Sequence, residues 1–209
     1  MAHNELTWKF INEFDVENEF LQRARSAAIE HGLDPIAPAV GAQMALVAAA
    51  ANASNIVEIG TGLGLSALWV LEGAPEATLT SIDSEFEYHE QAREIFTAAG
   101  YPASRIRLIT GKALDVLPRM NENSYDIVVV DGDPEQLVAN VEHALRLVRV
   151  GGTVLIPHAL WNGEVANPAN RSKVPAAFRA IITEASEADD VVVALSSAGD
   201  GLLQLTKIA

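Results

Sequence analysis

The sequence contains no cysteine among its 209 residues, which excludes a disulfide framework, a thiolate metal site and a cysteine nucleophile. Basic residues are scarce as well: 14 Lys and Arg stand against 28 Asp and Glu, a formal net charge of −14. A surface this acidic repels phosphate backbones and anionic membranes, so we expect neither nucleic acid nor membrane as a partner. With 49% hydrophobic residues, the chain is nevertheless rich enough in apolar side chains to build one sizeable core.

Long apolar runs are also missing. The most apolar stretch, Met44–Ala51, is far shorter than the roughly 20 residues that a membrane-spanning helix needs. The first residues do not combine a basic start with an apolar segment, which is the pattern of a secretory signal. We therefore expect a cytoplasmic protein.

From residue 55 onward, short β-branched runs alternate with amphipathic stretches. Such alternation predicts a mainly parallel sheet with helices on both faces. Near the C-terminus, two runs are joined by a short turn at Gly199-Asp200-Gly201, which predicts a hairpin whose last strand is antiparallel. The expected α/β fold has seven strands: Asn55–Ile59, Ala77–Ile82, Ile106–Thr110, Asp126–Val130, Thr153–Ile156, Val191–Leu195 and Leu202–Ile208.

Helical spacing of apolar residues predicts two helices before the first strand, at Val16–His31 and Pro35–Ala53. We assign residues 1–34 to an N-terminal helical segment, either part of the same domain or a dimer contact, and residues 35–209 to the main domain. The helices expected between the strands are Gly64–Gly73, Phe86–Gly100, Leu114–Met120 and Pro134–Val150.

A glycine-rich turn, Val-Glu-Ile-Gly-Thr-Gly-Leu-Gly-Leu-Ser at residues 57–66, follows the first strand and opens a helix. Glycines let the backbone approach a ligand closely, and the helix N-terminus adds free N–H groups and partial positive charge. Asp83 ends the second strand, where a carboxylate can accept both hydroxyls of a ribose. The G-x-G-x-G spacing differs from the usual G-x-G-x-x-G dinucleotide fingerprint, which argues against an NAD-dependent oxidoreductase.

The E-x-G-x-G-x-G motif with an acidic end to the second strand resembles the class I S-adenosylmethionine-dependent methyltransferases. Further motifs make the chain similar to the small O-methyltransferases of the catechol and caffeoyl-CoA type, in their bacterial branch. These motifs are Gly111-Lys112-Ala113, Asp131-Gly132-Asp133, Gly151-Gly152 and Leu160–Val165. The resemblance covers about residues 35–209. It implies a Rossmann-like sheet with cofactor and small-molecule acceptor at the carboxyl ends of its strands, and a homodimer.

The resemblance also implies roles for individual residues. Glu58 and the glycine loop line the methionine part of the cofactor, Ser66 binds its carboxylate and Asp83 holds its ribose. The small residues Gly111 and Ala113 leave room for the adenine. The full set of implied cofactor contacts is Glu58, Gly60, Gly62, Gly64, Ser66, Asp83, Gly111, Ala113 and Asp131, the last of which also lies near the acceptor.

Two positions depart from the metal-dependent members, in which the fourth strand ends in Asp-x-Asp-Lys and the fifth is followed by Asp-Asn. Here Pro134 replaces the lysine and Pro157-His158 replaces the Asp-Asn pair. Because Mg²⁺ prefers oxygen ligands and proline offers none, we expect no metal at the usual site. The alternative is a mixed site for a borderline metal, made by Asp131, Asp133 and His158.

His158 is the candidate general base, with Asp131 to orient it, because imidazole exchanges protons near neutrality. The alternative role for His158 is a polar residue that fills the vacated metal cavity. Trp161 is expected to stack on a planar acceptor or else to pack under the loop, and Asp133 is a second expected substrate contact. The other histidines, His89 among them, are expected at the surface.

The predicted function is therefore methyl transfer from S-adenosylmethionine to a hydroxyl of a small molecule. A competing interpretation is a protein that binds S-adenosylmethionine with lost or altered catalysis, since both the lysine and the metal ligands are changed. The charge disfavours an RNA methyltransferase.

Overall fold

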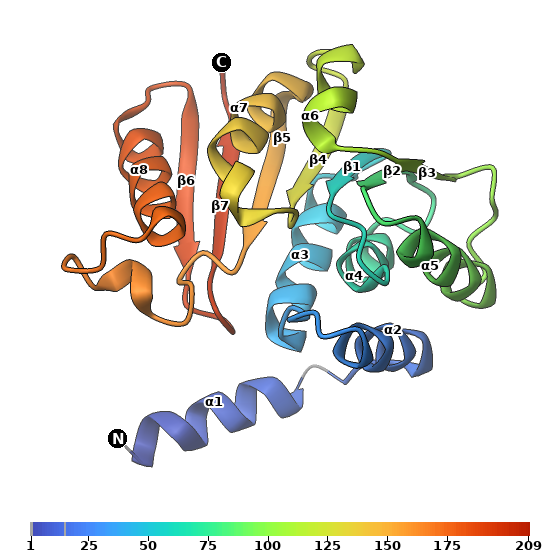
Figure 1. Ribbon diagram of the computed structural model, residues 1–209, viewed down its shortest axis with the longest axis horizontal. Helices are drawn as coiled ribbons and strands as arrows, with labels where there is room; N and C mark the ends of the chain where they lie inside the picture. Colours follow the sequence, from blue (N-terminus) through green and yellow to red (C-terminus); the bar gives the residue numbers. More distant parts are fainter. Residues whose placement is uncertain (1, 15) are drawn as a thin grey trace.

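The computed structural model describes residues 2–14 and 16–209, so residues 1 and 15 of the predicted N-terminal segment lie outside the description (Figure 1). Seven strands form one sheet: β1 (Asn55–Ile59), β2 (Thr78–Asp83), β3 (Ile106–Thr110), β4 (Tyr125–Val130), β5 (Val148–Pro157), β6 (Val191–Ser196) and β7 (Leu202–Lys207). Their order is β3-β2-β1-β4-β5-β7-β6. β1 to β5 pair in parallel, and β7 runs antiparallel to both β5 and β6. This confirms the predicted Rossmann-like sheet with an antiparallel last strand.

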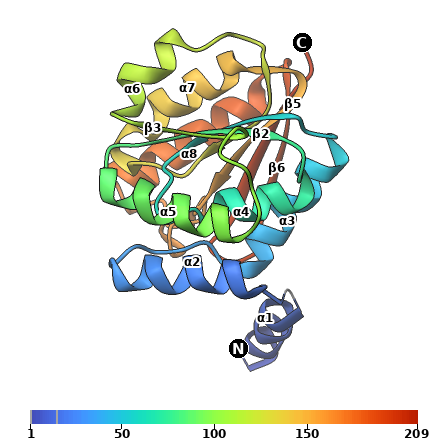
Figure 2. The same cartoon turned by 90° about the vertical axis from the view of Figure 1, so that its right-hand side faces the viewer.

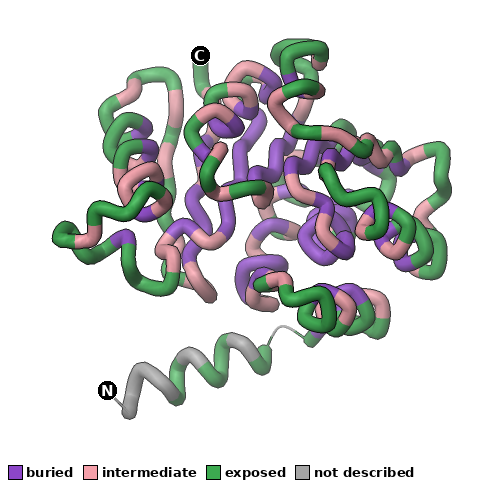
Figure 3. Tube along the Cα trace, in the orientation of Figure 1, coloured by how far each residue is buried: buried purple, intermediate pink, exposed green. Residues whose placement is uncertain are grey.

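The central strands are buried on both faces, as the colours of Figure 3 show. In β4, every residue after Tyr125 is buried, which explains why Ile127–Val130 is a continuous apolar run instead of an alternating one. β6 lies at the edge and alternates between intermediate and exposed positions, with Val192 exposed at 57% of its surface. The difference follows from position in the sheet, because only an inner strand is covered on both sides.

Helices cover both faces of the sheet (Figures 1 and 2). One face carries α2 (Glu19–Glu30), α3 (Pro38–Ala50), α4 (Leu65–Gly73) and α5 (Phe86–Ala98), which share a core with Ile56, Leu79 and Ile127. The other face carries α6 (Ala113–Val116), α7 (Leu137–Leu147) and α8 (Lys173–Glu187), and α7 and α8 share a second core with Val57, Val128 and Val154. None of the helices within residues 2–14 and 16–209 combines the length and apolar character that crossing a membrane requires.

The N-terminal segment differs from the prediction at its helix boundaries. α2 begins at Glu19 instead of Val16, because the side-chain oxygen of Asn18 accepts hydrogen bonds from the N–H groups of Phe20 and Leu21 at 2.9 and 3.0 Å. A further helix that was not predicted separately, α1 (Ala2–Phe14), precedes it. Both views show α1 projecting from the body of the molecule (Figures 1 and 2). Its exposed apolar side chains are Leu6, Phe10, Ile11 and Phe14.

The start of β5 also differs. The predicted fifth strand begins at Thr153, after the pair Gly151-Gly152, yet β5 already begins at Val148. Tyr125 of β4 pairs with Val148 and Ile127 pairs with Thr153, so the residues between them form a bulge within the strand. Gly151 takes φ +81° there. A Cβ on Gly152 would lie 2.7 Å from the backbone oxygen of Asp126, so the bulge needs a residue without a side chain.

Candidate functional site

The site is a cavity of about 690 Å³ at the carboxyl ends of β1, β2, β4 and β5, the edge where an open α/β sheet binds its ligands. The volume is that of a small-molecule site. Most of the predicted site residues line it, and Glu58 and Gly64 are the two that do not. The predicted residues on its wall are Gly60, Gly62, Ser66, Asp83, Gly111, Ala113, Asp131, Asp133, His158 and Trp161.

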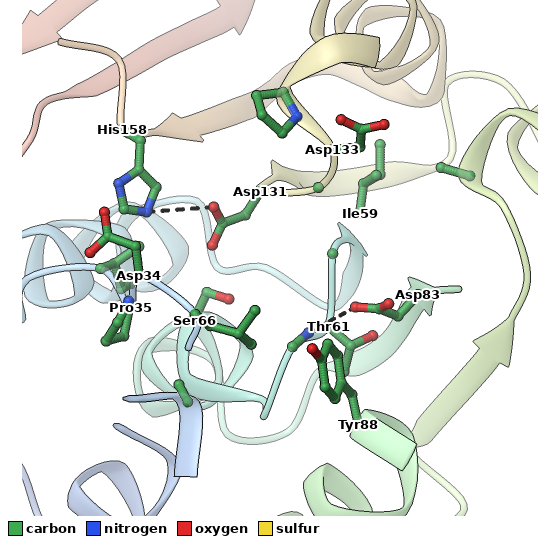
Figure 4. Close-up of a pocket in the computed structure, with 18 of the residues that line it drawn as sticks. Asp34, Pro35, Ile59, Thr61, Ser66, Asp83, Tyr88, Asp131, Asp133 and His158 are labelled. Carbon is green, nitrogen blue, oxygen red and sulfur yellow. Dashed lines mark hydrogen bonds and ion pairs between the residues drawn. The ribbon is translucent and has the colours of Figure 1, made fainter. Parts of the chain in front are cut away.

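The glycine loop is shaped by close contacts with neighbouring backbone. Gly60 has φ +92°, and a Cβ at this position would lie 2.2 Å from the backbone oxygen of Asp131. Gly62 lies in the same region at φ +46°, and its N–H donates to Oδ2 of Asp83 at 2.9 Å (Figure 4). Gly64 is the N-cap of α4, and a Cβ there would lie 2.8 Å from the ring of Phe96. Gly64 therefore allows α5 to pack against the loop and does not face the cavity.

Glu58 is fully buried behind the loop and holds Ser66 in place. Its Oε1 accepts the Ser66 hydroxyl at 2.7 Å, and its Oε2 accepts the Ser81 hydroxyl at 2.5 Å. Burial raises the pKa of Glu58 to about 8, against the opposing effect of the two serine hydroxyls. Glu58 itself does not line the cavity, whereas Ser66, which it holds, does; the implied contact of Glu58 with the methionine part of the cofactor stays a prediction.

A buried series of hydrogen-bonded side chains continues from Ser81 to Thr110. The Thr61 hydroxyl lies 2.6 Å from that of Ser81 and 2.9 Å from Nε2 of His89, whose Nδ1 lies 2.9 Å from the Thr110 hydroxyl. His89 is only 1% exposed, so the expectation of a surface histidine was wrong. The helical spacing of His89 with Ala92 and Phe96, which are both buried in α5, was the signal that places it on the inner face. Burial lowers the pKa of His89.

At the other end of the cavity, His158 lies between two carboxylates. Its Nε2 is 3.8 Å from Oδ1 of Asp131 and its Nδ1 is 3.8 Å from Oδ2 of Asp200. Figure 4 shows the imidazole directed toward Asp131, with Asp34 beside the pair. Burial raises the pKa of Asp131 to about 6 and also raises that of Asp200. Asp34 and Asp200 were not predicted as site residues, although both line the cavity.

Trp161 and Asp133 both touch the cavity but have other contacts too. The Trp161 ring packs on Phe178 of α8, with centroids 6.1 Å apart. Oδ1 of Asp133 accepts the N–H of Glu135 at 2.9 Å, and Oδ2 accepts the side-chain amide of Gln136 at 3.0 Å. Asp133 thereby caps the short 3₁₀ turn at Pro134–Gln136, which replaces the first turn of the predicted helix.

Asn140 is a site residue that the sequence did not reveal. It lies one helical turn after Gln136 on α7, lines the cavity and is 1% exposed. Its Oδ1 has no hydrogen-bond partner, and within the described residues no other buried side-chain polar atom is left in that state. A buried acceptor without a partner is unusual in folded proteins, and here it borders a cavity that is large enough for a ligand.

The donor set around His158 decides whether a metal ion fits the site. Within residues 2–14 and 16–209, no three His, Asp or Glu side chains are grouped so that they could hold one. Asp131 and His158 are adjacent, but Pro157 is the last residue of β5 and Pro134 opens the 3₁₀ turn, so neither contributes a ligand. The described residues at the usual metal position therefore do not fit Mg²⁺.

Comparisons with known proteins agree with this geometry. A family model described as O-methyltransferase matches residues 13–208. A curated relative from Mycobacterium marinum, assigned by its name to the O-methyltransferases, is 38% identical over 188 residues, which cover 90% of this chain and 84% of the relative. A crystal structure from Corynebacterium glutamicum superposes with a TM-score of 0.89 at 30% identity, covering 100% of this chain and 98% of that one. The O-methyltransferase TomG from Streptomyces achromogenes is involved in tomaymycin synthesis and was solved in complex with SAM. It superposes with a TM-score of 0.82 at 25% identity, and the match covers 93% of this chain and 92% of that one.

Proposed function

Because the chain belongs to the O-methyltransferase family, we propose that it transfers a methyl group to a hydroxyl of a small-molecule acceptor without a divalent metal. Its cofactor is S-adenosylmethionine, with which related structures of the same fold are solved. The observation that carries the proposal is the placement of His158 beside Asp131. This ionisable pair lies at the end of β4 and β5, in the same cavity as the glycine loop.

Three features of the cavity support the fit of the cofactor. Gly60 and Gly62 carry no side chain on the cavity wall, so a ligand can approach the backbone of the loop closely. Ser66 lies in the first turn of α4, where free N–H groups favour a carboxylate. Asp83 lines the cavity at the end of β2, and the small residues Gly111 and Ala113 lie on the wall that follows β3.

The chemistry divides between cofactor and chain. When bound, S-adenosylmethionine supplies a methyl group on a sulfonium, which is already an activated donor. The chain supplies alignment and a base. With the cofactor bound, Nε2 of His158 would take the proton of the acceptor hydroxyl, so that the acceptor oxygen could bond to the methyl carbon while the carbon–sulfur bond breaks, with S-adenosylhomocysteine and the methyl ether as products. Asp131, beside Nε2, stabilises the protonated imidazole.

The acceptor occupies the end of the cavity nearest His158. Trp161 provides an aromatic wall for a planar molecule, and Asp133 also lines the cavity. The acidic character of this end, with Asp34, Asp131 and Asp200 on its wall, favours a neutral or cationic acceptor over an anionic one.

A second candidate function is binding of S-adenosylmethionine without catalysis. It is favoured by the replacement of the lysine and the Asp-Asn pair of the metal-dependent members, by Pro134 and Pro157-His158. The two functions share the cofactor and differ only in turnover.

The test compares the wild-type chain with His158→Ala on a panel of phenols and alcohols, with EDTA and with added Mg²⁺. We expect methyl transfer that survives EDTA and falls about a hundredfold in His158→Ala, with S-adenosylhomocysteine affinity unchanged by calorimetry. Turnover that needs Mg²⁺, or that persists in His158→Ala, contradicts the proposed mechanism. Cofactor binding with no methylated product across the panel supports the non-catalytic alternative.

We further propose that the protein works as a cytoplasmic homodimer and has no nucleic-acid partner, with residues 1–34 as a dimer contact and residues 35–209 as the catalytic domain. The exposed apolar side chains of α1, Leu6, Phe10 and Phe14, support a contact there. Light scattering of the full chain and of Phe10→Glu tests this, and a monomer in both contradicts it.

A further inference from the structure

We propose that Asp200 is a positioning residue for His158: one oxygen of its carboxylate holds the loop that carries His158, and the other fixes which imidazole nitrogen bears the proton. The inference rests on the proposed function, because it assigns a role to Asp200 through the base.

The loop after β5 has an unusual backbone. His158, Trp161 and Asn162 have φ values of +56°, +47° and +54°, all in the left-handed region and none of them glycine. This conformation is costly for residues with a Cβ, so it persists only where surrounding contacts determine it. A loop of five residues with three such positions needs an outside support.

The turn between β6 and β7 provides that support. The N–H of Leu160 donates to the backbone oxygen of Asp200 at 2.8 Å, and the N–H of Asn162 donates to Oδ1 of Asp200 at 2.6 Å. The two segments also approach closely, since a Cβ on Gly201 would lie 2.6 Å from Cγ of Leu160. Asp200 thus binds the loop at two points, one of which is a residue in the left-handed region.

The second carboxylate oxygen faces the imidazole. Oδ2 of Asp200 lies 3.8 Å from Nδ1 of His158, on the side of the ring opposite Asp131. Each ring nitrogen thus lies 3.8 Å from a carboxylate, but the Asn162 N–H holds Asp200 in place and favours its charged form, whereas burial raises the pKa of Asp131 to about 6. The charge beside Nδ1 therefore favours the tautomer with the proton on that nitrogen, which leaves the lone pair on Nε2. Nε2 is the nitrogen directed toward Asp131 (Figure 4). The base therefore presents its free nitrogen to the side where the acceptor hydroxyl is proposed to bind.

Asp200→Asn separates the two tasks, because an amide oxygen can still accept the Asn162 N–H while the negative charge beside Nδ1 is lost. Asp200→Ala removes both contacts. Asp189→Asn is the matched control, with the same chemical change at an exposed position just before β6 and outside the cavity.

The first measurement is the ¹⁵N NMR spectrum of histidine-labelled protein saturated with S-adenosylhomocysteine, with the His158 signals assigned by His158→Gln. We expect mostly the Nδ1–H tautomer in wild type and in Asp189→Asn, and a clear loss of that tautomer in Asp200→Asn. The melting temperature and S-adenosylhomocysteine affinity of Asp200→Asn should stay close to wild type, which shows that the loop is still held.

The second measurement is turnover with whichever acceptor of the panel is methylated. We expect kcat of Asp200→Asn to fall about ten- to a hundredfold, with KM for S-adenosylmethionine unchanged. An unchanged tautomer in Asp200→Asn overturns the positioning role. If no acceptor is methylated by wild type, the proposed function fails, while the NMR result still decides whether Asp200 orients His158.

Discussion

The backbone N–H of Gly62 donates a 2.9 Å hydrogen bond to Oδ2 of Asp83, and Oδ1 of the same carboxylate accepts the N–H of Glu85. One side chain therefore joins the glycine loop of β1 to the turn after β2. Asp83 combines two roles at this place: it fixes the loop, and it is the proposed acceptor for the ribose hydroxyls.

Asp83→Ala should consequently weaken S-adenosylhomocysteine binding in two ways, because it removes the contact with the ligand and also the hydrogen bonds that hold the glycine loop. Hydrogen bonds to a charged acceptor contribute about 1.5–3 kcal/mol each, so we expect at least about a tenfold rise in Kd by calorimetry. Asp189→Asn should bind as wild type does. An unchanged Kd in Asp83→Ala would exclude Asp83 from the cofactor site.

Gly60 and Gly32 offer a matched pair for testing the close packing of the glycine loop against the Asp131 backbone. Both have positive φ, +92° and +73°, but a Cβ added to Gly32 would meet no atom within 4 Å, whereas one added to Gly60 would meet the Asp131 backbone oxygen. Gly32→Ala should cost about 1 kcal/mol from backbone strain alone. Gly60→Ala should cost clearly more, about 3 kcal/mol or above, and should abolish cofactor binding. If the two variants lost the same free energy of unfolding in urea, the close approach of β1 and β4 at Gly60 would be contradicted.

Glu58 predicts a pH-dependent stability. Its pKa is raised from 4.5 to about 8, so the folded state keeps its proton where the unfolded state loses it. Its contribution to stability is complete below pH 4.5 and is lost as pH rises toward 8. Glu58→Gln has no ionisable group at this position, so its stability lacks this dependence on pH. The melting temperature of Glu58→Gln relative to wild type should therefore rise between these two pH values, and a constant difference across the range would contradict the raised pKa.

Asn140 predicts a variant that is stable yet impaired. Its Oδ1 is buried without a partner, so replacing the amide by an apolar side chain of similar size removes an unsatisfied group. Asn140→Leu should melt at or above the wild-type temperature, while KM for the acceptor rises. Asn140→Asp serves as the opposite control, because it places a charge in the same buried position and should lower the melting temperature. A lower melting temperature in Asn140→Leu would mean that the amide has a partner in solution.

Sequence alone predicted the parts of the site that are local in the chain. The glycine loop, Ser66 and the acidic end of β2 are read from consecutive residues, and all strands were predicted to within a few residues except β5. The predicted fifth strand begins only after Gly151-Gly152, and the pairing with β4 shows that these glycines form a bulge within a longer strand.

The residues that the sequence missed depend on contacts between distant segments. Asp200 was seen only as part of a turn, because the pairing of Pro157 with Leu202, which brings that turn to His158, is set by the order of strands in the sheet. His89 was misplaced because histidine is usually polar surface, and its hydroxyl partners Thr61 and Thr110 come from two other elements. The partners of Asp200 and of His89 have no local signature, although the helical spacing of His89 with Ala92 and Phe96 does place it on the inner face of α5.

The position of β7 between β5 and β6 has a consequence for biosynthesis. Because β7 is an inner strand although it follows β6 in sequence, the Asp200 turn cannot be anchored in the sheet until residues 202–207 have left the ribosome. The glycine loop and Asp83 emerge more than a hundred residues earlier. The cofactor end of the cavity can therefore take shape on the nascent chain earlier than the wall around His158, which waits for β7.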